Sequence, residues 1–265
     1  MTDYITIIQS SLAVLQAIVL AVLIIMMFFK ADTGKNIILF VFYGFALNSF
    51  LLSDLFWIVY TVLRPDIRMP FAANEFGEYA FFLLFAAALA YVFRSDKRAT
   101  KEAIFAVLFV AANTALWYGW SGELIQDALT GFCLGYLSYI AVNSAKHCNA
   151  LKTSEWISIG VVSVLLVFMQ ALTFFVPERP AYIIDKCCYV LIFLGILFFI
   201  VKSVLAILYL KNDSKQSLCI VSIGLAWTII SLYMSSGIFY AIVLNFVTLF
   251  MPFTYIAVRR EATNA

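Results

Sequence analysis

Several carboxylates in this sequence lie inside long apolar runs, where a charged group is costly. Asp54 is the clearest case, because about nine residues, or roughly 13 Å of helix, separate it from the end of its run. Phe50, Trp57 and Thr61 share its helical face. A charge at such depth costs about 2.5–3.5 kcal/mol and usually marks function. The alternative is a structural hydrogen bond from Asp54 to another span.

A second group of acids opens the next apolar run, where Glu75, Glu78 and Tyr79 share one face. Carboxylates among aromatic rings suit a cationic or amine-bearing ligand, through charge and cation–π attraction. The predicted ligand-binding residues are Asp54, Trp57, Thr61, Glu75, Glu78, Tyr79, Trp117 and Asp127. The alternative is that these acids are interfacial residues and that the tryptophans form the aromatic belt of a membrane protein.

The sequence lacks the motifs of most other chemistry. Its single histidine, His147, supplies neither bis-histidine haem ligation nor a zinc-protease site. It has no nucleophile elbow, no glycine-rich phosphate loop and no basic tract of the kind that nucleic acid requires. The five cysteines show no CxxC spacing. We therefore predict no enzyme, cofactor, metal or nucleic-acid partner, although a membrane enzyme built on carboxylates alone stays open.

The elements that position these residues are predicted to be membrane-spanning helices. Hydrophobic residues make up 65% of the 265 residues and charged residues 12%, against about 45–50% and about 25% in soluble domains. Apolar runs of roughly 20 residues alternate with short charged loops, and a spanning segment must satisfy its backbone internally. We predict an all-α bundle with spans at 4–29, 36–63, 72–93, 102–119, 123–145, 155–176, 181–210, 217–234 and 238–258.

The distribution of basic residues predicts the orientation of these spans. With the N-terminus outside, the inner segments hold twelve basic residues: Lys30, Lys35, Arg94, Lys97, Arg98, Lys101, Lys146, Lys152, Lys211, Lys215, Arg259 and Arg260. The outer segments hold four: Arg64, Arg68, Arg179 and Lys186. The positive-inside rule thus favours an external N-terminus and a cytoplasmic C-terminus, in a bacterial-type plasma (inner) membrane.

The chain is predicted to form one transmembrane domain, 1–265, with an internal duplication. Residues 72–95 align without gaps on 180–203, which gives parallel repeats at 36–145 and 155–258 after one added span. Chance similarity between apolar segments is the alternative. A re-entrant hairpin at 217–258 is the alternative to two full crossings.

Residues 53–93, SDLFWIVYTVLRPDIRMPFAANEFGEYAFFLLFAAALAYVF, resemble a helical hairpin in the multi-pass sensor regions of bacterial signalling proteins. In such hairpins an aromatic-rich stretch with an aspartate is followed by a loop with a proline and then by an acid with aromatics. The resemblance covers about 40 of the 265 residues. Those proteins usually continue into an output domain, whereas this chain ends about seven residues after the last predicted span.

The combined prediction is a ligand-binding multi-pass membrane protein with an outward-facing acidic and aromatic pocket. It would act as a sensor or accessory subunit, with the lipid bilayer, a small cationic ligand and a signalling or energy-coupling protein as partners. The alternative is a transporter for a small molecule or cation, in which the deep carboxylates bind the substrate or a coupling proton.

Overall fold

The computed structural model describes residues 2–29, 36–63, 73–93, 99–175, 178–210 and 213–264. These residues form nine α-helices, and none of them lies in a β-strand. The helices are α1 (Thr2–Phe29), α2 (Ile37–Leu63), α3 (Ala73–Val92), α4 (Lys101–Ser121), α5 (Leu124–His147), α6 (Thr153–Phe175), α7 (Glu178–Tyr209), α8 (Ser214–Tyr233) and α9 (Gly237–Asn264).

Every one of these nine helices is long and apolar enough to cross a membrane. The predicted all-α, nine-span fold is therefore confirmed for the described residues, and the chain is a multi-pass membrane protein. The largest difference lies at the C-terminus, where α9 continues about six residues beyond the predicted end of the last span. The long seventh span is a single helix of 32 residues. The predicted repeat at 36–145 and 155–258 stays a prediction.

Contacts at the two ends of the bundle show that successive helices alternate in direction. At one end Lys146 pairs with Glu102 (2.6 Å between Nζ and Oε1), and Lys202 pairs with Glu155 (2.5 Å). We call this the basic end, and it carries Lys101, Lys146, Lys152, Lys202, Lys215, Arg259 and Arg260. At the other end the Gln9 amide donates to the Gly237 carbonyl oxygen at 3.2 Å. We call it the acidic end, and every odd-numbered helix begins there.

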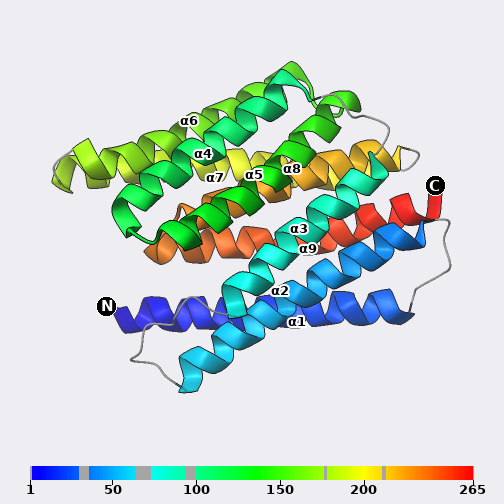
Figure 1. Cartoon of the computed structure of the whole chain (residues 1–265), viewed down its shortest axis with the longest axis horizontal. Helices are drawn as coiled ribbons and strands as arrows, with labels where there is room; N and C mark the ends of the chain where they lie inside the picture. The colour runs from blue at the N-terminus through cyan, green and yellow to red at the C-terminus, as the bar shows by residue number, and fades with distance from the viewer. Residues whose placement is uncertain are drawn as a thin grey trace.

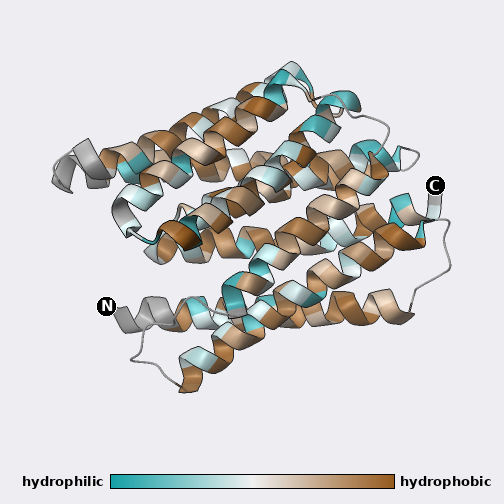
Figure 2. Ribbon diagram, viewed as in Figure 1, coloured by the Kyte–Doolittle hydropathy of each residue, from teal (hydrophilic) through white to brown (hydrophobic). Residues whose placement is uncertain are grey.

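Helix α8 lies at the centre of the bundle. It packs against α5, α7 and α9, and 89% of its span is buried, against 28–61% for the other spans. Figure 1 shows α1, α2 and α3 along one side of the bundle and α4 and α6 along the opposite side. Figure 2 shows that apolar residues are frequent along all the helices, and many large apolar side chains are exposed, as expected where lipid surrounds the bundle.

Helices α2 and α3 approach each other closely toward the acidic end, at Gly77. A Cβ atom at Gly77 would lie 2.8 Å from both the Ser49 carbonyl oxygen and Ser53 Cβ. Only glycine fits there, because the Ser49 carbonyl oxygen belongs to the rigid backbone of α2 and cannot move aside. This approach places the Ser53–Asp54 turn of α2 directly beside the Glu78 turn of α3.

Candidate functional site

The two deepest acids predicted from the sequence come together at the α2–α3 approach. Ser53 Oγ donates to the Asn74 carbonyl oxygen (2.7 Å) and to Glu78 Oε1 (3.5 Å). Asp54 is only 9% exposed and lies within electrostatic range of Glu78. We call Asp54 and Glu78 the acid pair. The hydroxyl of Tyr240, on α9, lies within electrostatic range of both carboxylates.

Aromatic side chains from three other turns surround the acid pair. Tyr233, the last residue of α8, donates a hydrogen bond from its hydroxyl to Glu78 Oε2. Its ring meets Phe82 of α3 and Trp117 of α4 edge-on, with centroids 5.8 Å and 6.1 Å away. The central helix of the bundle therefore ends at the acid pair. Four helices contribute to this cluster besides α2.

The electrostatic environment of the acid pair is negative. Within the described part of the chain neither carboxylate is paired with a basic side chain, and the basic residues named above for the basic end lie at the opposite end of the bundle. Asp54 Oδ2 is buried and accepts no hydrogen bond from any described protein group. An uncompensated carboxylate at this depth is strongly unfavourable unless a proton or a cation joins it.

Gln16 of α1 is a further buried polar residue at the depth of the site. Its side chain is fully buried, and neither its Nε2 nor its Oε1 has a hydrogen-bond partner among the described residues. The Gln9–Gly237 contact aligns α1 with α9, and the Tyr43–Thr254 hydroxyl contact (2.6 Å) aligns α2 with α9. Counted along the helices from these two contacts, Gln16 lies level with residue 244 of α9, and Asp54 lies level with residue 243. Gln16 and Asp54 are therefore at the same depth in the bundle.

A layer of aromatic rings closes the α2–α3 interface on the basic-end side of the acid pair. Phe50 stacks on Phe81 with centroids 4.7 Å apart, Phe81 lies parallel to Phe85 at 5.9 Å, and Tyr43 meets Phe85 at 6.0 Å. All four rings are at most 5% exposed. The acid pair is thus separated from the basic end by packed rings, whereas fewer than ten residues separate Glu78 from the beginning of α3.

The other residues predicted to bind ligand lie at varying distances from this cluster. The Tyr79 hydroxyl turns away and contacts Thr130 Oγ1 of α5 at 2.7 Å. Thr61 Oγ1 donates to the Trp57 carbonyl oxygen of its own helix at 2.8 Å, and Trp57 is half-buried. Glu75 is half-buried in the first turn of α3. Trp117 joins the acid pair through Tyr233.

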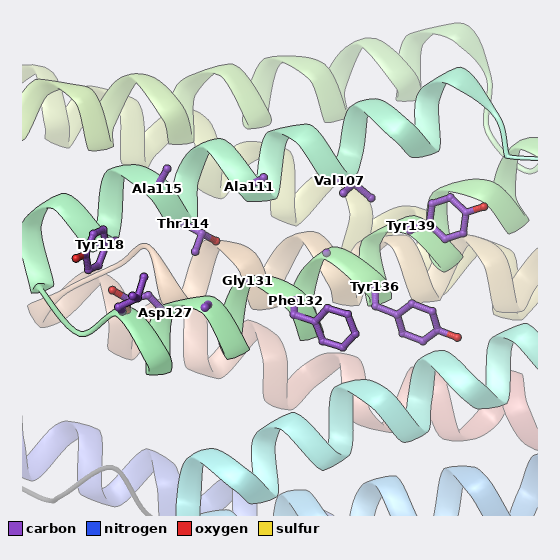
Figure 3. Close-up of a pocket in the computed structure, with 13 residues that line it drawn as sticks. Val107, Ala111, Thr114, Ala115, Tyr118, Asp127, Gly131, Phe132, Tyr136 and Tyr139 are labelled. Carbon is purple, nitrogen blue, oxygen red and sulfur yellow. The ribbon is translucent and has the colours of Figure 1, made fainter.

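Asp127 belongs to a different feature. It is 3% exposed, accepts a hydrogen bond from Ser121 Oγ at 2.5 Å, and lines a groove of about 630 Å³ between α4 and α5. Figure 3 shows Asp127 and Tyr118 at one end of this groove and Tyr139 at the other. The structure therefore does not bring Asp127 to the acid pair.

Sequence reasoning missed Tyr233, Tyr240 and Gln16. Both tyrosines are close to the break at 235–237, where tyrosine is an ordinary membrane-interface residue. Gln16 is a lone amide in an apolar run, and its burial depends on how α2 and α9 pack on α1. No local pattern distinguishes these three residues from structural ones.

The described residues include no group of three or more His, Cys, Asp or Glu side chains that could hold a metal ion. Comparisons of the chain with protein-family models, with curated proteins and with solved structures found no match.

Proposed function

We propose that this protein is a ligand-binding sensor or accessory subunit of a bacterial-type plasma membrane, and that it binds a small organic cation at the acid pair. The observation that carries the proposal is the meeting of two carboxylates, Asp54 and Glu78, in a buried aromatic cluster without a basic partner among the described residues. A ligand cation would supply the missing charge.

The cluster offers the contacts that an ammonium group uses. Asp54 Oδ2 is free to accept a charge-assisted hydrogen bond, and Glu78 adds a second negative charge. The rings of Tyr233 and Trp117 provide faces for cation–π attraction, which is worth about 2 kcal/mol or more at desolvated sites. The amide of Gln16 could bind a polar group of the same ligand from the α1 side.

The position of the acid pair favours sensing over transport. The aromatic layer of Phe50, Phe81 and Phe85 fills the interface between the acid pair and the basic end. A site approached from one side only suits a receptor, whereas a carrier needs access from both. The positive-inside count puts the acidic end outside, so the ligand would come from the exterior.

Tyr233 gives the site a route to the rest of the molecule. A ligand that competes for Glu78 would change the hydrogen bond that holds the end of α8. Helix α8 contacts α5, α7 and α9 and at its other end meets α9 again, where Ser214 Oγ donates to Glu261 Oε2 at 2.5 Å. A protein partner bound at the basic end would respond to such a movement of α8. This role agrees with the resemblance of residues 53–93 to sensor regions.

The proposal is tested by thermal unfolding of purified protein with ethylammonium and tetramethylammonium chloride as probes, against sodium chloride at equal ionic strength. The wild type should be stabilised saturably by at least one of the two probes. Asp54→Asn should weaken that binding at least tenfold, because an ion pair is lost. Asp127→Asn is the matched control, since it removes another buried aspartate and should bind like the wild type. Equal weakening in both variants would refute the site.

A flux measurement separates the sensor from the transporter. Proteoliposomes with wild-type protein should bind the labelled probe without accumulating it. Uptake that depends on a proton or sodium gradient, and that Asp54→Asn abolishes, would replace the sensor with a cation-coupled carrier.

A further inference from the structure

One polar side chain faces outward near the middle of a membrane span. Asn48 is the twelfth of the 27 residues of α2, roughly 16 Å from the nearer end of the helix, and its side chain is exposed. Among the described residues no other amide or ionisable side chain is exposed so deep within a span. The position is unusual, because an unpaired amide in hydrocarbon costs several kcal/mol.

The protein itself does not satisfy this amide. Asn113 and Asn245, two other asparagines within spans, donate to the carbonyl oxygens four residues before them, at 2.9 Å and 3.3 Å. Asn48 makes no such bond and has no other hydrogen-bond partner among the described residues. Its donors and its acceptor are therefore available to a neighbour in the membrane.

The surface around Asn48 has the shape of a helix-packing site. Asn48 and Gly44 line a groove of about 360 Å³ between α1 and α2, together with Met27 and Phe40. Apart from Ile37 and Leu63 at its two ends, the exposed residues of α2 follow one another at alternating spacings of three and four: Ile38, Val41, Phe45, Asn48, Leu52, Leu55, Val59 and Val62. This average spacing of 3.5 residues is that of a seam between two helices that pack side by side. We call these eight residues the α2 seam.

We propose that the α2 seam is the interface of a homodimer, in which Asn48 of each copy hydrogen-bonds to Asn48 of the other. Copies of one chain share their orientation in the bilayer, so a two-fold axis along the membrane normal makes the two α2 helices parallel and sets identical residues at the same depth. An asparagine amide carries both donors and an acceptor, so it is its own complement. A single asparagine in such a seam also fixes register and oligomeric state.

A second copy fits these observations better than lipid does. Acyl chains can fill the apolar groove but cannot pair an amide, whereas a facing Asn48 satisfies it with two reciprocal hydrogen bonds. The proposal is independent of the acid pair, because the α2 seam lies on the face of α2 opposite to Tyr43, Phe50 and Asp54.

The first test is disulfide cross-linking of the full chain in native membranes. Asn48→Cys and Leu52→Cys should each form a covalent dimer under mild oxidation. Leu108→Cys, exposed at 59% within the α4 span, should not exceed the unsubstituted chain, whose own Cys187 is exposed and sets the background. Cross-linking at Leu108 equal to that at Asn48 would overturn the proposal.

The second test measures dimerisation of cysteine-intact protein by energy transfer between labelled copies at increasing lipid dilution. Asn48→Leu keeps the exposed surface apolar and should not disturb the fold. It should weaken the dimer roughly three- to tenfold, the value of one interhelical hydrogen bond or more. A wild type that is monomeric at every dilution would overturn the proposal, as would a dimer that Asn48→Leu leaves unchanged.

Discussion

The two acids of the acid pair have different surroundings. Glu78 receives hydrogen bonds from Tyr233 and Ser53, whereas Asp54 Oδ2 receives none. Glu78 is therefore held in place by hydrogen bonds from α8 and α2, whereas Asp54 Oδ2 can still accept a hydrogen bond. A carboxylate oxygen that is buried without a hydrogen-bond partner weakens the fold. In the proposed function, this difference gives ligand contact to Asp54 and coupling to Glu78.

Substitutions at Asp54 and at Tyr233, the hydrogen-bond partner of Glu78, should accordingly change stability in opposite directions. Without ligand, Asp54→Asn should raise the unfolding temperature, because it removes an uncompensated buried carboxylate. Tyr233→Phe should lower the free energy of unfolding by about 1.5–3 kcal/mol, since a hydrogen bond to a charged group is lost. Thermal unfolding in detergent measures both. Tyr136→Phe, on the exposed face of α5, is the matched control and should change little. A loss of stability in Asp54→Asn would contradict this assignment.

At the scale of the elements, the site depends on how closely two helices approach. Gly77 allows α3 to contact the backbone of α2 at Ser49 and Ser53, and this contact sets the separation of the two carboxylates. Gly160 of α6 offers a comparison, because a Cβ atom there would meet nothing within 4 Å. The two glycines have the same intrinsic effect on a helix and differ only in what surrounds them.

Gly77→Ala should therefore destabilise the protein by about 1–3 kcal/mol, the usual cost of overpacking, and should weaken probe binding because α2 and α3 must separate. Gly160→Ala should be neutral or should stabilise by about 0.5–1 kcal/mol, since alanine is the better helix former. Thermal unfolding and probe titration of both variants measure the contrast. Equal stability of the two variants would show that the close approach at Gly77 is not required.

Much of the element structure follows from the sequence, because hydrophobic length and loop charge act locally. Both the nine spans and the depth of Asp54 can be predicted from these local properties of the sequence. The extension of α9 is not, since it depends on contacts between distant segments: Arg260 donates to the Ile207 carbonyl oxygen and Glu261 accepts from Ser214. The role of Tyr233 is hidden for the same reason, because α3 and α8 are far apart in the sequence. The sequence predicts Asp127 among the ligand-binding residues because depth alone does not indicate which helices are neighbours.

At the scale of the whole molecule, the acid pair, Gln9 and Gly237 are toward one end, and the ion pairs of Lys146 and Lys202 are at the other. The assignment of these ends to the two sides of the membrane rests on the positive-inside rule. Two exposed loop residues can be used to test this assignment: Ser236 lies at the acidic end and Asn149 at the basic end.

In intact cells, Ser236→Cys should react with a membrane-impermeant maleimide, and Asn149→Cys should react only after permeabilisation. A tag at the C-terminus should behave like Asn149→Cys, because α9 ends at the basic end. The variants need a Cys187→Ser background, since Cys187 is itself exposed near the acidic end. Labelling of Asn149→Cys or the C-terminal tag in intact cells would invert the orientation and place the acid pair toward the cytoplasm.

The central position of α8 has a consequence for how the protein is made. A segment surrounded on nearly every side by protein, with Ser217, Ser222 and Ser231 buried along it, still lacks one of its three neighbours, α9, when it first leaves the ribosome. Helix α9, the neighbour with which α8 makes the most extensive contact, is synthesised after it. The surroundings of α8 are therefore complete only once α9 has also been synthesised, and until then hydroxyl groups that the folded bundle buries have fewer protein neighbours.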